Sequence, residues 1–283
     1  MGAWDAWIGR EEIRSDRIDP SLAARWLATL DREAPGDDSV PQGLHWCLCL
    51  PDVPTARLGR DGHAQSDHSA ESFLPPAPLP RRMWASGKVE FLAPLRVGAA
   101  VKRTSRVLSV TEKSGGSGPL VFVDIAHETV GDAVLAVRET QSLVYRKAVC
   151  ENAPLLPPRR GVGVFDPTRW EHHRMIVPEP PLLFRYSALT FNSHRIHYDL
   201  PYARDVERYR GLVVQGPLTA TLLLDLARRG LRDNTLASFA FRGLTPAFCD
   251  EPLNLVMRRG EAGLELGAFA HDGRQIMSAT GTT

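Results

Sequence analysis

The sequence predicts an α+β fold built from two similar units, each a helix followed by antiparallel strands. Residues 88–146 hold runs rich in β-branched residues, with turn signals between them and no helical pattern. A parallel sheet would need strands that alternate regularly with helices. A proline-rich segment at residues 152–160 then divides the chain, and behind it helix and strands return. We therefore expect an N-terminal unit of residues 1–150 and a C-terminal unit of residues 165–283.

The first unit begins with an amphipathic helix. Asp19 and Pro20 are typical of a helix start, and the apolar residues behind them recur at helical spacing, namely Leu22, Trp26, Leu27 and Leu30. Residues 31–81 are rich in Pro, Gly, Asp and Ser and show little periodicity. Within them we expect a short buried strand at residues 45–50. Residues 59–80 should form a long irregular loop, of a length typical of functional or mobile loops.

Four strands are expected next, at residues 89–92, 100–110, 120–129 and 134–145. Residues 114–118, reading Ser-Gly-Gly-Ser-Gly, link two of them. This link lacks the Gly-Lys-Ser/Thr ending of a phosphate loop, and no helix follows it. We interpret it as a hairpin connection.

The second unit repeats this arrangement. Residues 182–191 are strand-like, residues 216–229 predict a strong helix, and further strands are expected at residues 237–241, 253–259 and 264–270. A faint internal echo supports two related units. Residues 91–95 and residues 243–247 each place a proline in fourth position before a polar strand.

Composition and charge exclude several classes of protein. Hydrophobic residues make up 43% and charged residues 24%, as in ordinary soluble globular proteins. The net charge of +1 gives no field that draws the chain to nucleic acid or membrane, and no apolar run approaches the roughly 20 residues that cross a bilayer. The four cysteines lack the spacing of a zinc site or a disulfide framework, and the N-terminus lacks the apolar stretch of a signal peptide. We expect a cytoplasmic protein without nucleic-acid or membrane partners.

The residues that carry chemistry gather behind the apolar run at residues 182–191. Six polar side chains fall within eight positions there: Asn192, His194, Arg195, His197, Tyr198 and Asp199. Gly216 and Pro217 then start the predicted helix. A glycine at a helix start leaves a bare backbone N–H that points at whatever docks there.

Residues 185–226 resemble the signature of the MaoC-like, hot-dog-fold enoyl-CoA hydratases. In that signature a strand ends in an Asp, one residue, an Asn-Pro pair, an apolar residue and the catalytic His. Asn192 lies at the family's Asp position, His194 at its Asn, Arg195 at its Pro and His197 at its His. The wording is closer to the branch of the itaconyl-CoA and mesaconyl-CoA hydratases and the mitochondrial 3-hydroxyacyl-thioester dehydratases. The resemblance implies a double hot dog, two fused units that each wrap a long helix in an antiparallel sheet, in which the N-terminal unit completes the substrate tunnel.

The resemblance also implies catalytic roles for three residues. His197 is the expected acid–base, because an imidazole with a pKa near 6.5 can accept and donate protons at neutral pH. The Gly216 N–H would stabilise charge on the thioester oxygen. Asn192 cannot exchange a proton as the family's Asp can, so it would orient the attacking water. His197 then shuttles both protons alone, which is the simpler version, or is assisted by His194 or Asp199.

Three neighbours are expected to bind substrate: His194, Arg195 and Tyr198. Arg195 is the candidate partner of a second carboxylate on the acyl group, because a guanidinium buried beside alkyl carbon without a partner is costly. The rival interpretation turns Arg195 toward solvent or toward a phosphate of CoA. His194 has a structural role as its alternative.

A metal site is not expected. His194 and His197 have the spacing of half a zinc site, and a third ligand would have to come from His172 or His173. His197 could also be a core histidine satisfied by a backbone carbonyl. The company of Asn192 and of a glycine-led helix favours the catalytic interpretation.

The expected function is the reversible hydration of a short enoyl-CoA, with itaconyl-CoA or mesaconyl-CoA giving citramalyl-CoA as first choice. The alternative is a 3-hydroxyacyl-thioester dehydratase of fatty-acid or polyketide metabolism. A hot-dog acyl-CoA thioesterase is a second alternative, although its acidic residue on the helix is not evident, since Asp225 lies well into the helix. A non-catalytic acyl-binding module is a third. The acyl-CoA is the expected partner, no cofactor is expected beyond the CoA of the substrate, and homo-oligomerisation is left open.

Overall fold

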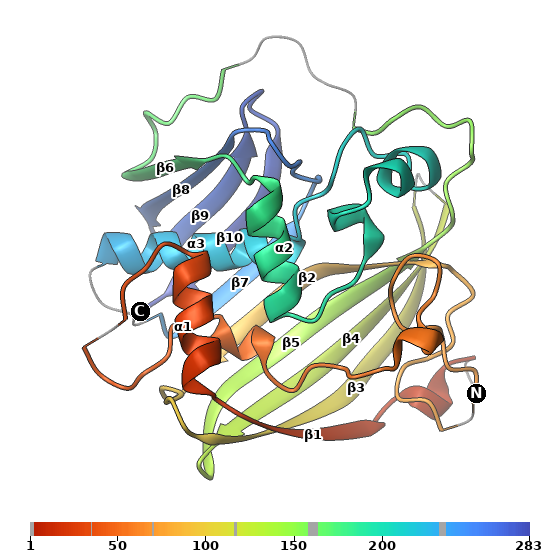
Figure 1. Ribbon diagram of the computed structural model, residues 1–283, viewed down its shortest axis with the longest axis horizontal. Coiled ribbons are helices and arrows are strands. Elements are labelled where there is room, and N and C mark those ends of the chain that lie inside the picture. Colours follow the sequence, from red (N-terminus) through yellow and green to blue (C-terminus); the bar gives the residue numbers. More distant parts are fainter. Residues whose placement is uncertain (1–2, 35, 70, 116–117, 158–163, 232–235) are drawn as a thin grey trace.

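All ten strands belong to one antiparallel sheet. The computed structural model describes residues 3–34, 36–69, 71–115, 118–157, 164–231 and 236–283. The strand order is β1-β3-β4-β5-β2-β7-β10-β9-β8-β6. Figure 1 shows the sheet as two groups of strands, with the first five strands of the chain in one group and the last five in the other.

The two groups define an N-terminal and a C-terminal half. The N-terminal half holds β1 (Glu11–Arg17), β2 (Arg81–Phe91), β3 (Ala100–Gly115), β4 (Gly118–Gly131) and β5 (Val134–Arg146). The C-terminal half holds β6 (His172–Ile176), β7 (Ser238–Gly243), β8 (Leu253–Gly260), β9 (Gly263–Ala270) and β10 (Gln275–Thr282). Seven of the nine strands expected from the sequence are confirmed as β2, β3, β4, β5, β7, β8 and β9, with shifted ends.

The halves join through β2 and β7, and their junction has an approximate two-fold axis. Lys88 of β2 pairs with Ala240 of β7, 152 positions later. Pro94 and Pro246, the prolines of the internal echo, have the same separation. Equivalent residues therefore face each other at the centre of the sheet, as they would across a symmetric interface between two subunits.

Three α-helices accompany the sheet. They are α1 (Pro20–Thr29), α2 (Pro180–Leu189) and α3 (Gly216–Leu231). The first two pack against each other, with the rings of Trp26 and Tyr186 at 6.3 Å. These two residues are 160 positions apart, as are the first residues of the two helices, so this contact also joins equivalent positions. The long helix α3 runs across the strands of the C-terminal half (Figure 1) and packs against β8 and β9.

The N-terminal half has no counterpart of α3 among the residues that the structure describes. Between α1 and β2 the chain makes only the short 3-10 turns η2 (Leu44–Cys47) and η3 (Thr55–Arg57), with irregular segments around them. The long loop expected at residues 59–80 is confirmed where it is described.

Two sequence predictions of strands are wrong. Residues 182–191 fall largely in α2, because Pro180 starts a helix and Leu183, Tyr186 and Leu189 recur every third residue on its buried face. Residues 45–50 begin within η2, which follows Gly43 at φ 99°. A short continuous apolar run does not distinguish a strand from a buried turn.

Three strands were not predicted, for a common reason. The strands β1 and β6 are the two edges of the sheet, and most of their residues are polar and at least partly exposed. The third, β10, is rich in Ser, Thr, Ala and Gly. Such strands lack the alternation of apolar residues on which strand prediction depends.

Two predicted connections fall partly outside the described residues. The hairpin link pairs Gly115 with Gly118, and positions 116–117 between them are not described. The expected linker at residues 152–160 is described up to residue 157. In the described part of the chain, no helix combines the length and the apolar character needed to span a bilayer.

Candidate active site

The segment that follows α2, residues 191–199, carries most of the hydratase signature, and we call it the signature loop. Hydrogen bonds fix its shape. Phe191, at φ 47°, turns the chain out of the helix, and the Asn192 N–H donates to the Ser187 carbonyl at 2.9 Å. The Asn192 Oδ1 accepts from the His194 N–H at 3.0 Å, which is the bond of an Asx turn. The 3-10 turn η4 (Arg195–His197) follows. Asn192 therefore holds the backbone that presents the histidines.

His197 is buried and oriented by a main-chain carbonyl. Its Nδ1 lies 2.7 Å from the Val213 oxygen. Because a carbonyl can only accept, Nδ1 carries the proton and Nε2 of the neutral ring is left as a base. The Val213 N–H donates back to the Ile196 carbonyl at 2.9 Å, which fixes the two segments together. Burial lowers the pKa of His197 to about 4, so the ring is neutral at neutral pH.

The start of α3 lies beside this turn. Gln215 holds it in place, because its Nε2 donates to the Leu183 carbonyl at 3.0 Å and to the Ser187 Oγ at 2.9 Å. Gly216 comes next, and its N–H is one of the four at a helix start without an intrahelical acceptor. A Cβ here would meet the Trp84 carbonyl at 4.0 Å and nothing closer. Packing within the protein therefore does not require this glycine.

These elements line a cavity of about 1740 Å³ that receives residues from both halves of the chain. Five of the six predicted site residues line it: Asn192, His194, His197, Tyr198 and Gly216. Its volume exceeds the roughly 300–1,000 Å³ of ordinary small-molecule sites. A long thioester substrate therefore has room to lie along it.

Arg195, the sixth predicted site residue, is not among the residues that line the cavity. Its guanidinium donates to the Asp199 carboxylate through Nε at 2.9 Å and through Nη2 at 2.6 Å. Nη1 donates to the Arg60 carbonyl at 3.0 Å, and the group lies 4.3 Å over the Tyr202 ring. The premise that this guanidinium lacks a protein partner is therefore wrong.

A segment of the N-terminal half, residues 60–63, is bonded to the signature loop, and we call it the strap. The Ser193 Oγ donates to the Gly62 carbonyl at 2.6 Å, and the Arg195 N–H donates to the Asp61 carbonyl at 2.8 Å. Gly62 has φ +89°, and a Cβ there would lie 1.9 Å from the Ser193 oxygen. Only glycine permits this approach.

The strap brings an unpredicted histidine, His63, into the cavity lining. Its Nδ1 lies 2.8 Å from the Asp61 Oδ2, and a carboxylate only accepts, so Nδ1 carries the proton. The His63 ring lies 4.1 Å from that of His194, which meets His197 edge-on at 5.4 Å. The acid–histidine spacing of Asp61 and His63 in a long loop was the available sequence signal.

The three histidines are neutral together. Burial lowers the pKa of His63, and burial with the charges of His63 and His197 lowers that of His194 to about 2. The positive charge of Arg82 acts on both in the same direction. Burial opposes ionisation of Asp61, but the hydrogen bond from His63 lowers its pKa to about 2. At neutral pH the cluster holds one carboxylate and three uncharged imidazoles.

Asp61, His63 and His194 also present ligand atoms within 4.8 Å of one another, a spacing at which a metal ion could bind. The third ligand considered from the sequence lies elsewhere, because the His173 Nε2 is 2.9 Å from the Asn254 Oδ1. The Nδ1–carboxylate contact already satisfies His63 and Asp61 as a hydrogen-bonded pair. That the site works without a metal stays a prediction.

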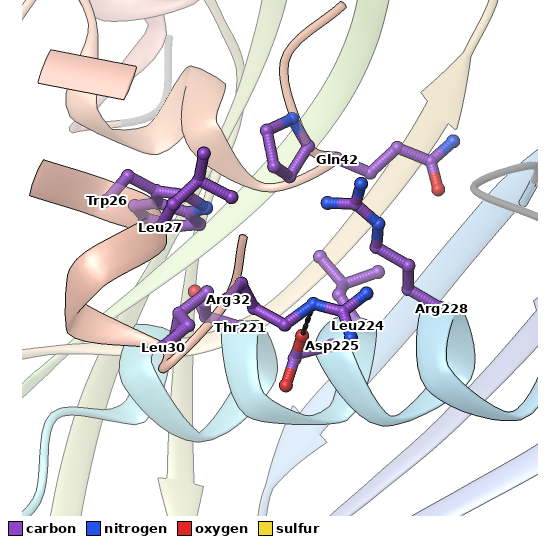
Figure 2. A pocket seen from close by; sticks show the side chains of 10 residues that line it. Trp26, Leu27, Leu30, Arg32, Gln42, Thr221, Leu224, Asp225 and Arg228 are labelled. Carbon is purple, nitrogen blue, oxygen red and sulfur yellow. Dashed lines mark ion pairs between the residues drawn. The ribbon is translucent and has the colours of Figure 1, made fainter. Parts of the chain in front are cut away.

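Asp225 is the acidic residue of α3 that a thioesterase would need. Its buried carboxylate accepts from Arg174 at 2.8 Å and Arg229 at 2.7 Å, and it pairs with Arg32 at 3.3 Å (Figure 2). It is absent from the lining of the large cavity. The arrangement fits a structural ion-pair cluster, and α3 thus gives the thioesterase alternative no acid in the cavity.

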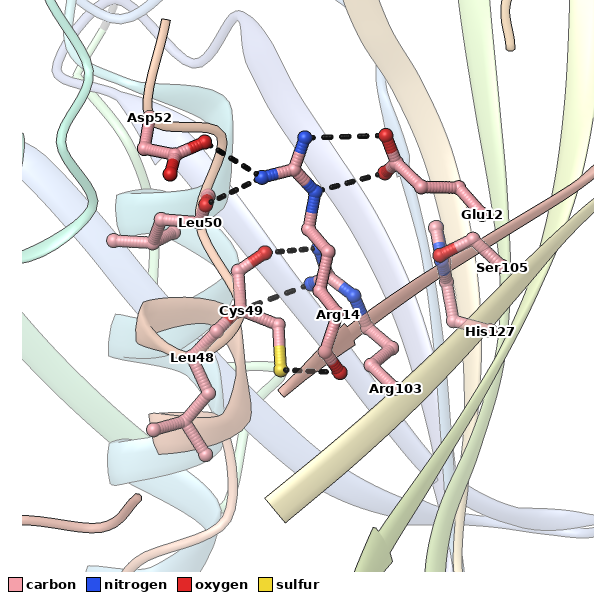
Figure 3. A network of polar contacts seen from close by, with 9 residues as sticks. All are labelled: Glu12, Arg14, Leu48, Cys49, Leu50, Asp52, Arg103, Ser105 and His127. Atoms are coloured by element: carbon pink, nitrogen blue, oxygen red, sulfur yellow. Dashed lines mark hydrogen bonds and ion pairs between the residues drawn. The ribbon is translucent and has the colours of Figure 1, made fainter. Parts of the chain in front are cut away.

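The wall that β3 and β4 contribute to the cavity is polar, but its groups have protein partners. Figure 3 shows Arg103 donating to the carbonyl oxygens of Leu48 at 3.2 Å and Cys49 at 2.6 Å. The Ser105 Oγ lies 2.8 Å from the His127 Nδ1 in the same figure. Arg103 and Ser105 are thus hydrogen-bonded within the protein, and their main role is structural.

The sequence model of the family described as hydroxyacyl-thioester dehydratase type 2 matches residues 43–249. The mesaconyl-C(4)-CoA hydratase of Chloroflexus aurantiacus is 41% identical over 98% of this chain and 96% of its own length. The mitochondrial hydroxyacyl-thioester dehydratase type 2 of Schizosaccharomyces pombe is 26% identical over 77% of each chain. The family match at residues 43–249 spans the signature and the strap together.

Solved structures show the same fold. A MaoC-like dehydratase superposes with a TM-score of 0.71 at 11% identity, covering 99% of this chain and 100% of its own. HtdX of Mycobacterium tuberculosis gives 0.68 at 18% identity, covering 96% and 99%. A third, Rv0216 of Mycobacterium tuberculosis, described as having a double hotdog fold, gives 0.59 at 14% identity, covering 97% and 95%. The predicted double hot dog is confirmed.

Proposed function

We propose that this chain, which belongs to the hydroxyacyl-thioester dehydratase type 2 family of MaoC-like hydratases, adds water to the double bond of a short enoyl-CoA. Members of this family are lyases, and this chain is one of them. The first-choice substrates are mesaconyl-CoA and itaconyl-CoA, which would both give citramalyl-CoA. One observation carries the proposal: His197 presents a free Nε2 to a large cavity beside the start of α3.

The His197 Nε2 accepts a proton from water while the water oxygen bonds to C3 of the acyl group. In mesaconyl-CoA, whose double bond is conjugated with the thioester, the electrons of the double bond move toward the thioester oxygen, where the Gly216 N–H and the dipole of α3 stabilise the charge. Donors of this kind are typically worth about 3 kcal/mol. His197 then gives the same proton to C2. The reaction is redox-neutral, so the proposal calls for no cofactor beyond the CoA.

Asn192 has a supporting role in this scheme. Its Oδ1 is engaged by the His194 N–H, so its amide N–H is the group left to meet water.

We further propose that residues 1–150 complete the tunnel around the acyl chain while residues 165–283 carry the chemistry. The cysteines Cys47, Cys49, Cys150 and Cys249 are all free, which supports a reducing compartment such as the cytoplasm.

The dehydration of a 3-hydroxyacyl thioester is the second candidate. The similarity to the Schizosaccharomyces pombe dehydratase favours it, and the same site would run the reaction in reverse. The two candidates differ in the acyl group and its length. The comparison of charged, short neutral and long neutral substrates therefore separates them.

The test follows the enoyl-thioester absorbance of mesaconyl-CoA, crotonyl-CoA and a long-chain enoyl-CoA, and the formation of citramalyl-CoA from itaconyl-CoA by chromatography, with free thiol measured in parallel. Loss of the double bond without thiol release is the expected result. His197→Ala should lower turnover by a factor of about 10² or more. His271→Ala, which removes an exposed histidine, is the matched control. Thiol release, or a His197→Ala variant with more than a third of wild-type activity, would overturn the proposal.

A further inference from the structure

Arg82 is a half-buried cavity arginine that has no protein partner among the described residues. It lies on β2 opposite Tyr145, and it lines the large cavity. Its neighbour Arg81 is fully engaged, with the Glu207 carboxylate at 2.5 Å and the Tyr209 hydroxyl at 3.1 Å. A guanidinium withdrawn from water without an anion is unfavourable. Arg82 is therefore prepared for an anionic ligand.

Arg82 lines the same cavity as His63, His194 and His197 of the active site. Its charge lowers the pKa of both His63 and His194, and the His194 ring meets that of His197. The Asp61 carboxylate is held by His63, and the Glu207 carboxylate is held by Arg81. The cavity thus combines a cation that is unpaired in the described part of the chain with three neutral imidazoles, and an anion that enters it would find no protein anion paired with Arg82.

We propose that Arg82 binds a carboxylate carried by C3 of the acyl group, and so selects enoyl thioesters of dicarboxylic acids. This subsite rests on the proposed function, because it assumes that C3 lies at His197. In a substrate with the carboxylate on the hydrated carbon, that carboxylate is one bond from the reacting atom. It must then lie beside His197, in the cavity that Arg82 also lines.

His63 gives the subsite a second donor. Because Asp61 holds the His63 Nδ1–H, a further proton on this ring must reside on Nε2. A bound carboxylate would favour that proton and accept a hydrogen bond from it. A phosphate of CoA is a poor candidate for the same place, since the pantetheine arm separates it from C3. The favoured ligand is therefore the acyl carboxylate.

Saturated thioesters test the subsite without turnover. Succinyl-CoA carries a carboxylate on C3, butyryl-CoA carries a methyl there, and glutaryl-CoA moves the carboxylate one carbon further. Titration calorimetry on the wild type should give a Kd for succinyl-CoA at least about 10-fold lower than for butyryl-CoA, the scale of a charge-assisted bond. Arg82→Met should erase this preference with the Kd for butyryl-CoA nearly unchanged. Arg82→Lys should keep part of it.

Arg195→Met is the matched control, because it removes a guanidinium that pairs with Asp199. It should leave the ratio of the two Kd values unchanged. If Arg82→Met weakens the binding of succinyl-CoA and butyryl-CoA by the same factor, Arg82 binds the CoA portion or has a structural role, and the subsite is overturned. A wild type that binds butyryl-CoA or glutaryl-CoA as tightly as succinyl-CoA would also overturn it. Hydration of crotonyl-CoA by the wild type tests the proposed function separately from the subsite. If the wild type hydrates crotonyl-CoA, the proposed function stands even when the subsite fails. If the wild type hydrates no enoyl-CoA, the proposed function fails, whichever analogue binds.

Discussion

Gly62→Ala should detach the strap from the active site. The methyl group would lie 1.9 Å from the Ser193 oxygen, whereas ordinary contacts begin at 3.4 Å, so one segment must move by about 1.5 Å. A shift of that size breaks the Ser193–Gly62 and Arg195–Asp61 bonds, at about 0.5–1.5 kcal/mol each. The left-handed φ of +89° adds about 1–2 kcal/mol for a residue with a side chain. We expect a total loss of about 2–5 kcal/mol in the free energy of unfolding.

Gly98→Ala separates the two causes. Gly98 has φ +87°, and a Cβ there meets nothing within 4 Å, so this variant carries the backbone cost alone. Urea unfolding of both variants gives the difference, and hydration kinetics should show a fall in kcat/KM of at least about 10-fold for Gly62→Ala only. Equal stabilities within about 0.5 kcal/mol, or full activity in Gly62→Ala, would refute the claim that the strap positions the site.

Three further results are expected. With crotonyl-CoA, kcat/KM should fall as the pH drops through about 4, because protonation of His197 removes the base. Between about pH 4 and neutrality, kcat/KM should stay level. A fall in kcat/KM that begins near pH 6.5 would contradict the buried position of His197. Asp225→Asn should lower the free energy of unfolding by about 3–5 kcal/mol in urea with KM unchanged, since three arginines lose their buried anion. Arg195→Met should reduce kcat/KM for mesaconyl-CoA and crotonyl-CoA by the same factor, and a selective loss of the charged substrate would restore Arg195 as a substrate-binding residue.

The sequence predicted what is encoded locally. The helix from Gly216 was evident because glycine, proline and an apolar stripe coincide there. The α1 start at Pro20 was evident from Asp19, whose side chain accepts from the Ser21 N–H. The error at residues 182–191 was also local. Pro180 and Pro181 before this run, and buried residues that recur at every third position, indicate a helix. The apolar content alone was misleading.

The strap could not be predicted from local patterns, because its contacts with the signature loop bridge 131 positions between Gly62 and Ser193. The same distance in sequence hides the meeting of His63 with His194. Arg195 is a different case. Its partner Asp199 follows four positions later, a spacing at which ion pairs commonly form, so its engagement could have been anticipated.

The described residues of the N-terminal half include no second long helix, and this has a consequence for how the protein can be altered. In a symmetric pair of identical subunits, every substitution appears twice, and a change that reshapes the binding pocket of one copy also changes the catalytic copy. Here one chain holds both halves of the fold, and the two halves have different sequences. The loops between α1 and β2, apart from the strap at residues 60–63, can therefore be varied as a library for acyl selectivity, while His197 and α3 remain as they are.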